Sequence, residues 1–121
     1  MTARLKGAVI GCGFFAQNHL HGWADLDDVE IVAVCDLDEA KARLAAERFG
    51  IARVYTSAET LFATEALDFV DIPTTMETHE ALTALAFAHG VPVILQKPFA
   101  PDLDGCRRIV AAAEAANVPL M

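Results

Sequence analysis

The sequence lacks any apolar run near the roughly 20 residues that a membrane-spanning helix needs. It is also poor in cations, because nine Lys and Arg stand against seventeen Asp and Glu, which gives a formal net charge of −8. Nucleic-acid binding favours a basic face, and the Arg107-Arg108 pair is explained by a solvated helix face. We therefore expect neither a membrane nor a nucleic acid as a partner.

Cysteine is scarce as well. Cys12, Cys35 and Cys106 make an odd number, and no pair among them has zinc-ligand spacing. His19 and His21 lie two positions apart on a predicted helix, face different directions and make a poor metal pair. We expect reduced thiols in a cytoplasmic protein and no metal site. A nucleophilic Cys12 is the less favoured alternative to a structural thiol.

The chain has no linker, low-complexity segment or internal repeat, and its 121 residues suit one domain over residues 1–121. Its mean hydropathy of +0.37 is high for a free-standing soluble domain, so we expect a neighbouring domain or subunit. Six strand patterns alternate with helical patterns. They predict a Rossmann-type, doubly wound α/β fold with a mostly parallel sheet of about six strands and helices on both faces. The expected strands cover 6–10, 30–35, 53–55, 67–72, 91–96 and 118–121, and the expected helices 14–26, 38–49, 57–65, 74–88 and 102–116.

Local signals mark several of the helix ends. Ser57 and Asp102 are predicted N-caps, because their side-chain oxygens can accept from the free N–H groups of a first turn. Gly50 is a predicted helix stop. The T-x-x-E pattern from Thr74 to Glu77 predicts a capping box that opens the fourth helix.

A glycine-rich turn between the first strand and the first helix is the most informative segment. Gly11 permits a tight turn, Gly13 lets a pyrophosphate approach the backbone, and Ala16 allows close helix–strand packing. The helix N-terminus offers N–H groups to phosphates, and Asp36, at the end of the next strand, can accept from an adenosine ribose. Small residues near a helix start also serve packing alone, so the pattern is weak by itself. The predicted cofactor-binding residues of this segment are Gly11, Gly13, Phe14, Phe15, Ala16 and Asp36.

A second group of residues follows the fourth and fifth predicted strands. Gln96-Lys97-Pro98 stands at the carboxyl end of the fifth strand, and Thr74 and His79 follow the fourth. Ligands of open parallel sheets bind outside the carboxyl ends of the strands. We therefore expect the loops after the first, second, fourth and fifth strands to converge on one edge. His79, near this edge, either contacts the cofactor or holds the site loop. The alternative for His79 is a structural hydrogen bond, and the alternative for Lys97 is a surface lysine before a turn proline.

The chain resembles the family of two-domain NAD(P)-dependent oxidoreductases typified by glucose–fructose oxidoreductase and inositol dehydrogenase. The resemblance rests first on G-C-G-F-F-A at 11–16, with His19 shortly after it, and on V-D-I at 70–72, with His79 seven positions beyond Ile72. It rests also on A-x-x-H-G-V-P-V-I-L at 86–95 and on the Lys-Pro pair at 97–98. It covers the whole chain as the N-terminal dinucleotide domain. This sequence has Gln96 where the family usually has Glu, and Thr75-Met76 where it favours Pro-Asn.

The resemblance implies that Lys97 lies beside the nicotinamide and the substrate as the catalytic residue, with Thr74, His79, Gln96 and Pro98 contacting the cofactor. It also implies that a further, C-terminal domain binds a sugar- or polyol-like substrate. The chain alone should therefore bind cofactor and show little or no turnover.

Asp36 also bears on the choice of cofactor. A carboxylate accepts from a 2′-hydroxyl and repels a 2′-phosphate, and Leu37 brings no compensating charge, so we predict NAD over NADP. Two alternatives stay open: a stand-alone, non-catalytic NAD-binding module that forms a homo-oligomer, and a methyltransferase that binds S-adenosylmethionine. The second ranks last because it gives the Lys-Pro loop no role.

Overall fold

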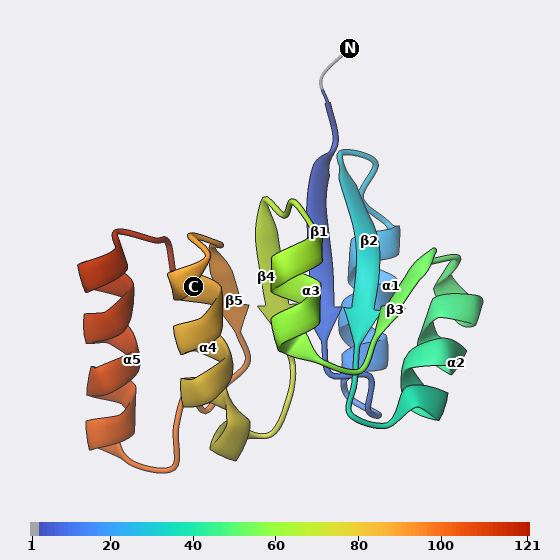
Figure 1. The fold of residues 1–121 in the computed structure, drawn as a ribbon. Coiled ribbons are helices and arrows are strands. Elements are labelled where there is room, and N and C mark those ends of the chain that lie inside the picture. Colours follow the sequence, from blue (N-terminus) through green and yellow to red (C-terminus); the bar gives the residue numbers. More distant parts are fainter. Residues whose placement is uncertain (1–2) are drawn as a thin grey trace.

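A computed structural model describes residues 3–121 as a five-stranded parallel sheet with helices on both faces (Figure 1). The strand order is β3-β2-β1-β4-β5, so the chain changes direction across the sheet between β1 and β4. The predicted fold class is confirmed. The strands are β1 (Leu5–Ile10), β2 (Val29–Cys35), β3 (Arg53–Tyr55), β4 (Phe69–Ile72) and β5 (Val93–Leu95). The helices are α1 (Ala16–Ala24), α2 (Glu39–Phe49), α3 (Ala58–Thr64), α4 (His79–Ala88) and α5 (Leu103–Ala116). A 3₁₀ turn, η1 (Met76–Thr78), comes directly before α4.

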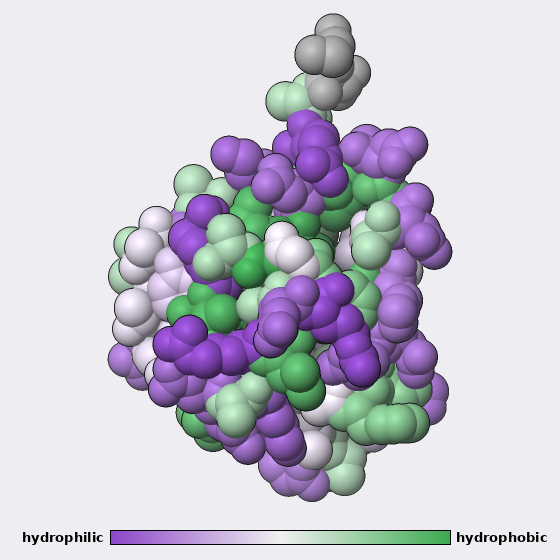
Figure 2. All heavy atoms as spheres, turned by 90° about the vertical axis from the view of Figure 1, so that its right-hand side faces the viewer, coloured by the Kyte–Doolittle hydropathy of each residue, from purple (hydrophilic) through white to green (hydrophobic). Residues whose placement is uncertain are grey.

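The three central strands are short apolar runs because both of their faces are covered. In β4 all four residues are buried, and in β1 the last four are. Strand β3, at one edge, has only three residues, which limits the length of unpaired backbone that it presents. Figure 2 shows that the side of the molecule with β3 and α2 is mostly hydrophilic, with hydrophobic residues scattered between polar ones.

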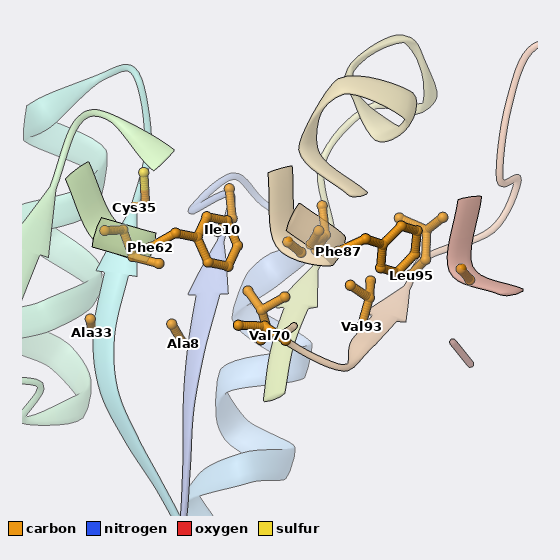
Figure 3. Close-up of a cluster of buried hydrophobic side chains, with 14 of the residues drawn as sticks. Ala8, Ile10, Ala33, Cys35, Phe62, Val70, Phe87, Val93 and Leu95 are labelled. Carbon is orange, nitrogen blue, oxygen red and sulfur yellow. The ribbon is translucent and has the colours of Figure 1, made fainter. Parts of the chain in front are cut away.

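Two hydrophobic clusters lie on opposite faces of the sheet. The larger joins the strands to Phe62 of α3, Phe87 of α4 and Ile109 of α5, and Figure 3 shows Phe62 and Phe87 in front of the strands that carry Ile10 and Leu95. The smaller cluster joins residues of α1 and α2 to β1 and β2. Helices α3, α4 and α5 therefore cover one face, and α1 and α2 cover the other.

The predicted local caps are present. The Ser57 side chain accepts from Thr60 N, and the Asp102 side chain accepts from Gly105 N at 2.8 Å. Gly50 ends α2 with a φ of 67°, in the left-handed region that favours glycine. Each cap satisfies backbone groups that the helix itself leaves free.

The predicted capping box is wrong. The residue at the N-cap of η1 is Thr75 rather than the predicted Thr74, and it makes no side-chain cap. Helix α4 follows η1 and begins at His79 rather than at Thr74. The reason is a competing bond: the Thr78 hydroxyl lies 2.8 Å from Thr75 O and 2.7 Å from Thr74 Oγ1, and these contacts hold the segment as a tight turn.

The other differences lie at element ends. The predicted sixth strand is reduced to a parallel bridge between Val93 and Leu120, with Leu95 N donating to Met121 O at 2.8 Å. The helix predicted over 14–26 is shorter, because Phe15 stands at its N-cap position and Asp25 at its C-cap. In residues 3–121, no helix combines the length and the apolar character required to cross a membrane.

Candidate functional site

The carboxyl ends of β1, β2, β4 and β5 lie along one edge of the sheet, the lower edge in Figure 1, and a cavity of about 870 Å³ opens there. The loops after all four strands contribute to its lining. Of the residues predicted to bind cofactor, the cavity is lined by Gly11, Gly13, Phe14, Phe15, Asp36, Thr74, Gln96 and Lys97. Ala16, His79 and Pro98 are not among its lining residues.

Gly11 and Gly13 act differently in the turn. Gly11 has a φ of +108°, and a Cβ at this position would lie 2.8 Å from Cγ2 of Thr74. A glycine is therefore required both by the backbone conformation and by the approach of the loop after β4. A Cβ at Gly13 would meet nothing within 4 Å, so the space beside Gly13 is open to a ligand.

Free backbone donors surround this open space. Within residues 3–121, the N–H groups of Gly13, Phe14 and Phe15 donate no hydrogen bond, and α1 begins directly after them with no side-chain cap. Ala16, which is fully buried, opens the helix against the sheet. Unpaired N–H groups at the start of a helix bind an anion well, and a pyrophosphate fits this donor set.

Asp36 is oriented by two backbone bonds. Its Oδ2 accepts from Cys12 N at 2.8 Å, and its Oδ1 accepts from Asp38 N at 2.8 Å. A carboxylate oxygen has two lone pairs, so each oxygen keeps capacity for a ribose hydroxyl. Beside it, Leu37 is 92% exposed, and across the turn Phe14 is 94% exposed, which gives the cavity apolar surface for aromatic rings.

The two cysteines near the turn are inert thiols. Burial, with a smaller effect of the Asp36 charge, raises the pKa of Cys12 to about 12 and that of Cys35 to about 11. A nucleophilic cysteine needs a lowered pKa, so the structure argues against the alternative role for Cys12. Within residues 3–121 there is no group of three or more His, Cys, Asp or Glu side chains that could hold a metal ion.

Lys97 and Gln96 supply the other end of the cavity. Gln96 N donates to Ile72 O at 3.3 Å, and the Gln96 side chain turns back to accept from Lys97 N at 3.1 Å. The Lys97–Pro98 bond is cis. No ion pair within residues 3–121 involves the Lys97 amine. The backbone of Lys97 is therefore held, and Lys97 is exposed and lines the cavity.

His79 lies behind the cavity wall. It is fully buried, its Nδ1 lies 3.0 Å from Phe99 O and its Nε2 lies 3.1 Å from Thr74 O. These carbonyls belong to the loops after β5 and β4. Of the two functional roles considered for His79, this geometry fits a hold on the site loop better than contact with the cofactor.

Asp71 forms a polar cluster to which sequence analysis assigned no role. It is fully buried in β4, and its Oδ2 accepts from His19 Nδ1 at 2.8 Å and from Trp23 Nε1 at 2.7 Å. Its Oδ1 is buried with no partner in the described residues. A signal was present in the sequence: His19 and Trp23 are four positions apart, on one helix face, and a carboxylate stands within an apolar strand.

Comparison with protein families gives one match over almost the whole chain. Residues 5–121 match the GFO_IDH_MocA family, which is described as an oxidoreductase family with an NAD-binding Rossmann fold.

The curated relatives are dehydrogenases. A D-apiose dehydrogenase from Paraburkholderia graminis is 54% identical over 118 residues, which is 98% of this chain and 32% of the relative. An inositol 2-dehydrogenase from Burkholderia vietnamiensis is 37% identical over 113 residues, 92% of this chain and 34% of the relative. This chain thus spans about a third of the length of the curated relatives that it matches.

Solved structures agree with this fold. An oxidoreductase from Agrobacterium radiobacter in complex with NAD⁺, L-tartaric acid and magnesium matches with a TM-score of 0.95 and 49% identity, over 98% of this chain and 35% of that one. GenD2 from gentamicin A biosynthesis, in complex with NAD, matches with a TM-score of 0.91 and 32% identity, over 99% of this chain and 34% of that one.

Proposed function

The chain belongs to the GFO_IDH_MocA oxidoreductase family as its NAD-binding Rossmann domain, and from this we propose which residues hold each part of the cofactor. Asp36 holds the adenosine ribose, the turn from Gly13 to Phe15 holds the pyrophosphate, and Lys97 lies beside the nicotinamide. The single observation that carries the proposal is that one cavity is lined by Asp36 and by Lys97. Asp36 directly follows β2, and Lys97 stands two positions after β5. Strands β1 and β4 lie between β2 and β5, so β2 and β5 are three strand spacings of about 4.8 Å apart.

We further propose NAD rather than NADP as the preferred cofactor. The Asp36 carboxylate, fixed by Cys12 N and Asp38 N, lies where a 2′-phosphate would bring a second negative charge. Lys41 and Arg43 are the nearby cations in the sequence, but Lys41 does not line this cavity and Arg43 pairs with Glu39. Like charges that meet in a partly buried site repel strongly.

The reaction proposed for the protein that contains this domain is hydride transfer between nicotinamide and a sugar- or polyol-like hydroxyl. NAD, when bound, supplies the hydride acceptor. The Lys97 amine donates a hydrogen bond to the substrate oxygen or, as the neutral amine, accepts the hydroxyl proton as the hydride leaves the adjacent carbon. The relatives named D-apiose dehydrogenase and inositol 2-dehydrogenase support a substrate of this class.

Binding is tested with the one tryptophan of the chain, Trp23, which lies on the helix that follows the glycine turn. Energy transfer from Trp23 to NADH should appear on titration and disappear on addition of NAD. NADPH should bind at least tenfold more weakly than NADH. Equal or tighter binding of NADPH would overturn the NAD preference, and displacement of NADH by S-adenosylmethionine would overturn the proposed function.

Catalysis is tested in the dehydrogenase that contains this domain, with NAD and a panel of sugars and polyols. Lys97→Met keeps the length of the side chain and removes the amine. It should lower kcat by at least a hundredfold, the range ascribed to general acid–base catalysis, while the NADH affinity stays within threefold. Lys41→Met, on the far side of the glycine turn, is the matched control and should retain full turnover.

A further inference from the structure

Two loops form the wall of the cavity at its nicotinamide end. One follows β4 and contains Thr74, and the other follows β5 and contains Lys97. Within residues 3–121, the ring of His79 is the one side chain that lies within hydrogen-bond distance of the backbone of both loops, at Thr74 O and Phe99 O. Phe99 stands two positions after Lys97, so this contact acts on the segment that carries the lysine.

Within residues 3–121, the other hydrogen bonds of the loop after β5 to the rest of the fold lie at its two ends, and the Phe99 side chain packs against the larger hydrophobic cluster. At its start, Gln96 N bonds Ile72 O. At its end, Ala100 is buried and lies close to Gly105, since a Cβ added to Gly105 would lie 2.7 Å from the Ala100 Cβ. Asp102, two positions later, caps the start of α5. The His79 ring reaches the loop between these anchors.

Burial of the ring indicates a directional role. A buried polar group is costly unless it is hydrogen-bonded, and an apolar side chain of similar size would fill the same space without that cost. The ring of His79 has an acceptor carbonyl at each nitrogen. A neutral imidazole has one N–H and serves one carbonyl at a time, whereas the protonated ring serves both.

We propose that His79 is a positioning residue, which holds the Lys97 segment from the start of α4 through the Phe99 carbonyl and thereby places the nicotinamide half of the site against the adenosine half. The inference rests on the proposed function. His79 does not touch the cofactor in this arrangement, and it acts through the Phe99 carbonyl.

Two substitutions separate the two contacts of His79. The amide of Asn reaches the position of Nδ1, so His79→Asn keeps the bond to Phe99 O, whereas the amide of Gln reaches the position of Nε2, so His79→Gln keeps the bond to Thr74 O. His89→Asn is the control, because His89 lies at the other end of α4 and stacks on Phe62.

NADH and ADP-ribose report on the two halves of the site, because ADP-ribose lacks the nicotinamide. His79→Gln should weaken NADH binding about tenfold and leave ADP-ribose binding within twofold, while His79→Asn and His89→Asn bind both within threefold. A purely structural role would weaken both ligands in parallel with the melting temperature, and that result would overturn the inference.

Hydrogen exchange of the ligand-free chain decides the role of His79 separately from cofactor binding. In His79→Gln the amides of Phe99 and Ala100 should exchange at least tenfold faster than in the wild type, with those of Thr75 and Thr78 unchanged. Equal exchange in the two His79 variants would overturn the inference. A wild-type chain that binds neither NADH nor ADP-ribose would instead overturn the proposed function.

Discussion

The carboxylate of Asp36 accepts a hydrogen bond of 2.8 Å from the backbone N–H of Cys12, so the acidic residue after β2 is joined directly to the glycine turn after β1. One side chain thus orders the glycine turn and lines the cavity. Under the proposed assignment, a change at Asp36 should act on both the ribose and the pyrophosphate parts of the site.

Asp36→Asn tests this double role. The amide keeps the size and one acceptor but loses the charge, and a hydrogen bond to a charged group contributes about 1.5–3 kcal/mol. We expect the NADH dissociation constant to rise about tenfold or more. The ratio of NADPH to NADH dissociation constants should fall by a similar factor, because the repulsion of a 2′-phosphate is removed.

The measurement is energy transfer from Trp23 to each reduced cofactor. Asp38→Asn is the matched control, since Asn caps a helix as well as Asp does and Asp38 does not line the cavity. A cofactor ratio that is unchanged in Asp36→Asn would contradict the assigned role.

The two glycines of the turn should respond oppositely to alanine. Gly11→Ala forces a Cβ to within 2.8 Å of Thr74 Cγ2 at a φ of +108°, and such strain costs about 1–3 kcal/mol, so the melting temperature should fall. Gly13→Ala meets no protein atom within 4 Å, so the melting temperature should stay close to that of the wild type. Its methyl group instead occupies ligand space, and NADH should bind at least tenfold more weakly. Calorimetry and NADH titration of the same samples check both outcomes, and a Gly13→Ala variant that binds normally would refute a close approach of the pyrophosphate.

The buried thiols predict a loss of stability at high pH. The thiol pKa values of Cys12 and Cys35 are raised from 9.0 to about 12 and about 11. Between pH 9 and these values the unfolded chain has released the protons while the folded chain still holds them, so the free energy of unfolding falls as the pH rises. Below pH 9 both states are protonated and the effect is absent.

Urea unfolding at pH 8 and pH 10 measures the fall in stability. The Cys12→Ala/Cys35→Ala variant should lose less stability between these two pH values than the wild type, whatever its stability at pH 8. An equal loss in both proteins would show that the thiols do not contribute. At pH 8 a thiol reagent should label the partly exposed Cys106 before either buried thiol.

Removal of the Asp71 carboxylate should destabilise the fold. Asp71→Ala leaves the N–H groups of His19 and Trp23 without their acceptor, at about 1–3 kcal/mol each, so we expect a loss of about 3 kcal/mol in urea unfolding. Asp71→Asn retains an acceptor and should lose less than half as much. Asp68→Ala is the control, because among residues 3–121 the Asp68 carboxylate accepts only from Lys6 N, in an exposed position, and its loss should cost about 1 kcal/mol. Equal losses for Asp68→Ala and Asp71→Ala would contradict the importance of the buried cluster.

Features that depend on neighbours in the sequence could be predicted. The glycine turn, the caps at Ser57 and Asp102 and the stop at Gly50 follow from contacts within a few residues, and the alternation of apolar runs is enough to predict the parallel sheet. The same locality produced the error at Thr74, where the T-x-x-E pattern is present but the Thr78 hydroxyl bonds the backbone first.

Features that depend on the tertiary structure could not be predicted. The partners of His79 are backbone carbonyls of Thr74 and Phe99, and a carbonyl has the same chemistry at every residue, so no side-chain pattern identifies them. The apolar pattern after Asn117 predicted a strand, yet apolar residues do not fix how many ladder hydrogen bonds form, and the segment makes a single bridge. The role of Asp71 required knowledge of which helix packs on β4.

Because β1 and β4 are neighbours in the sheet but distant in the chain, the cavity is lined by segments as far apart in the sequence as Gly11 and Lys97. A dinucleotide bound across this edge recognises the fully assembled sheet and has no counterpart in a partly folded chain. A ligand that binds only the native state at a hundredfold excess over its dissociation constant adds about 2.7 kcal/mol to the free energy of unfolding. We therefore expect the supply of cofactor to lengthen the time that this chain survives proteolysis, in addition to loading it for chemistry.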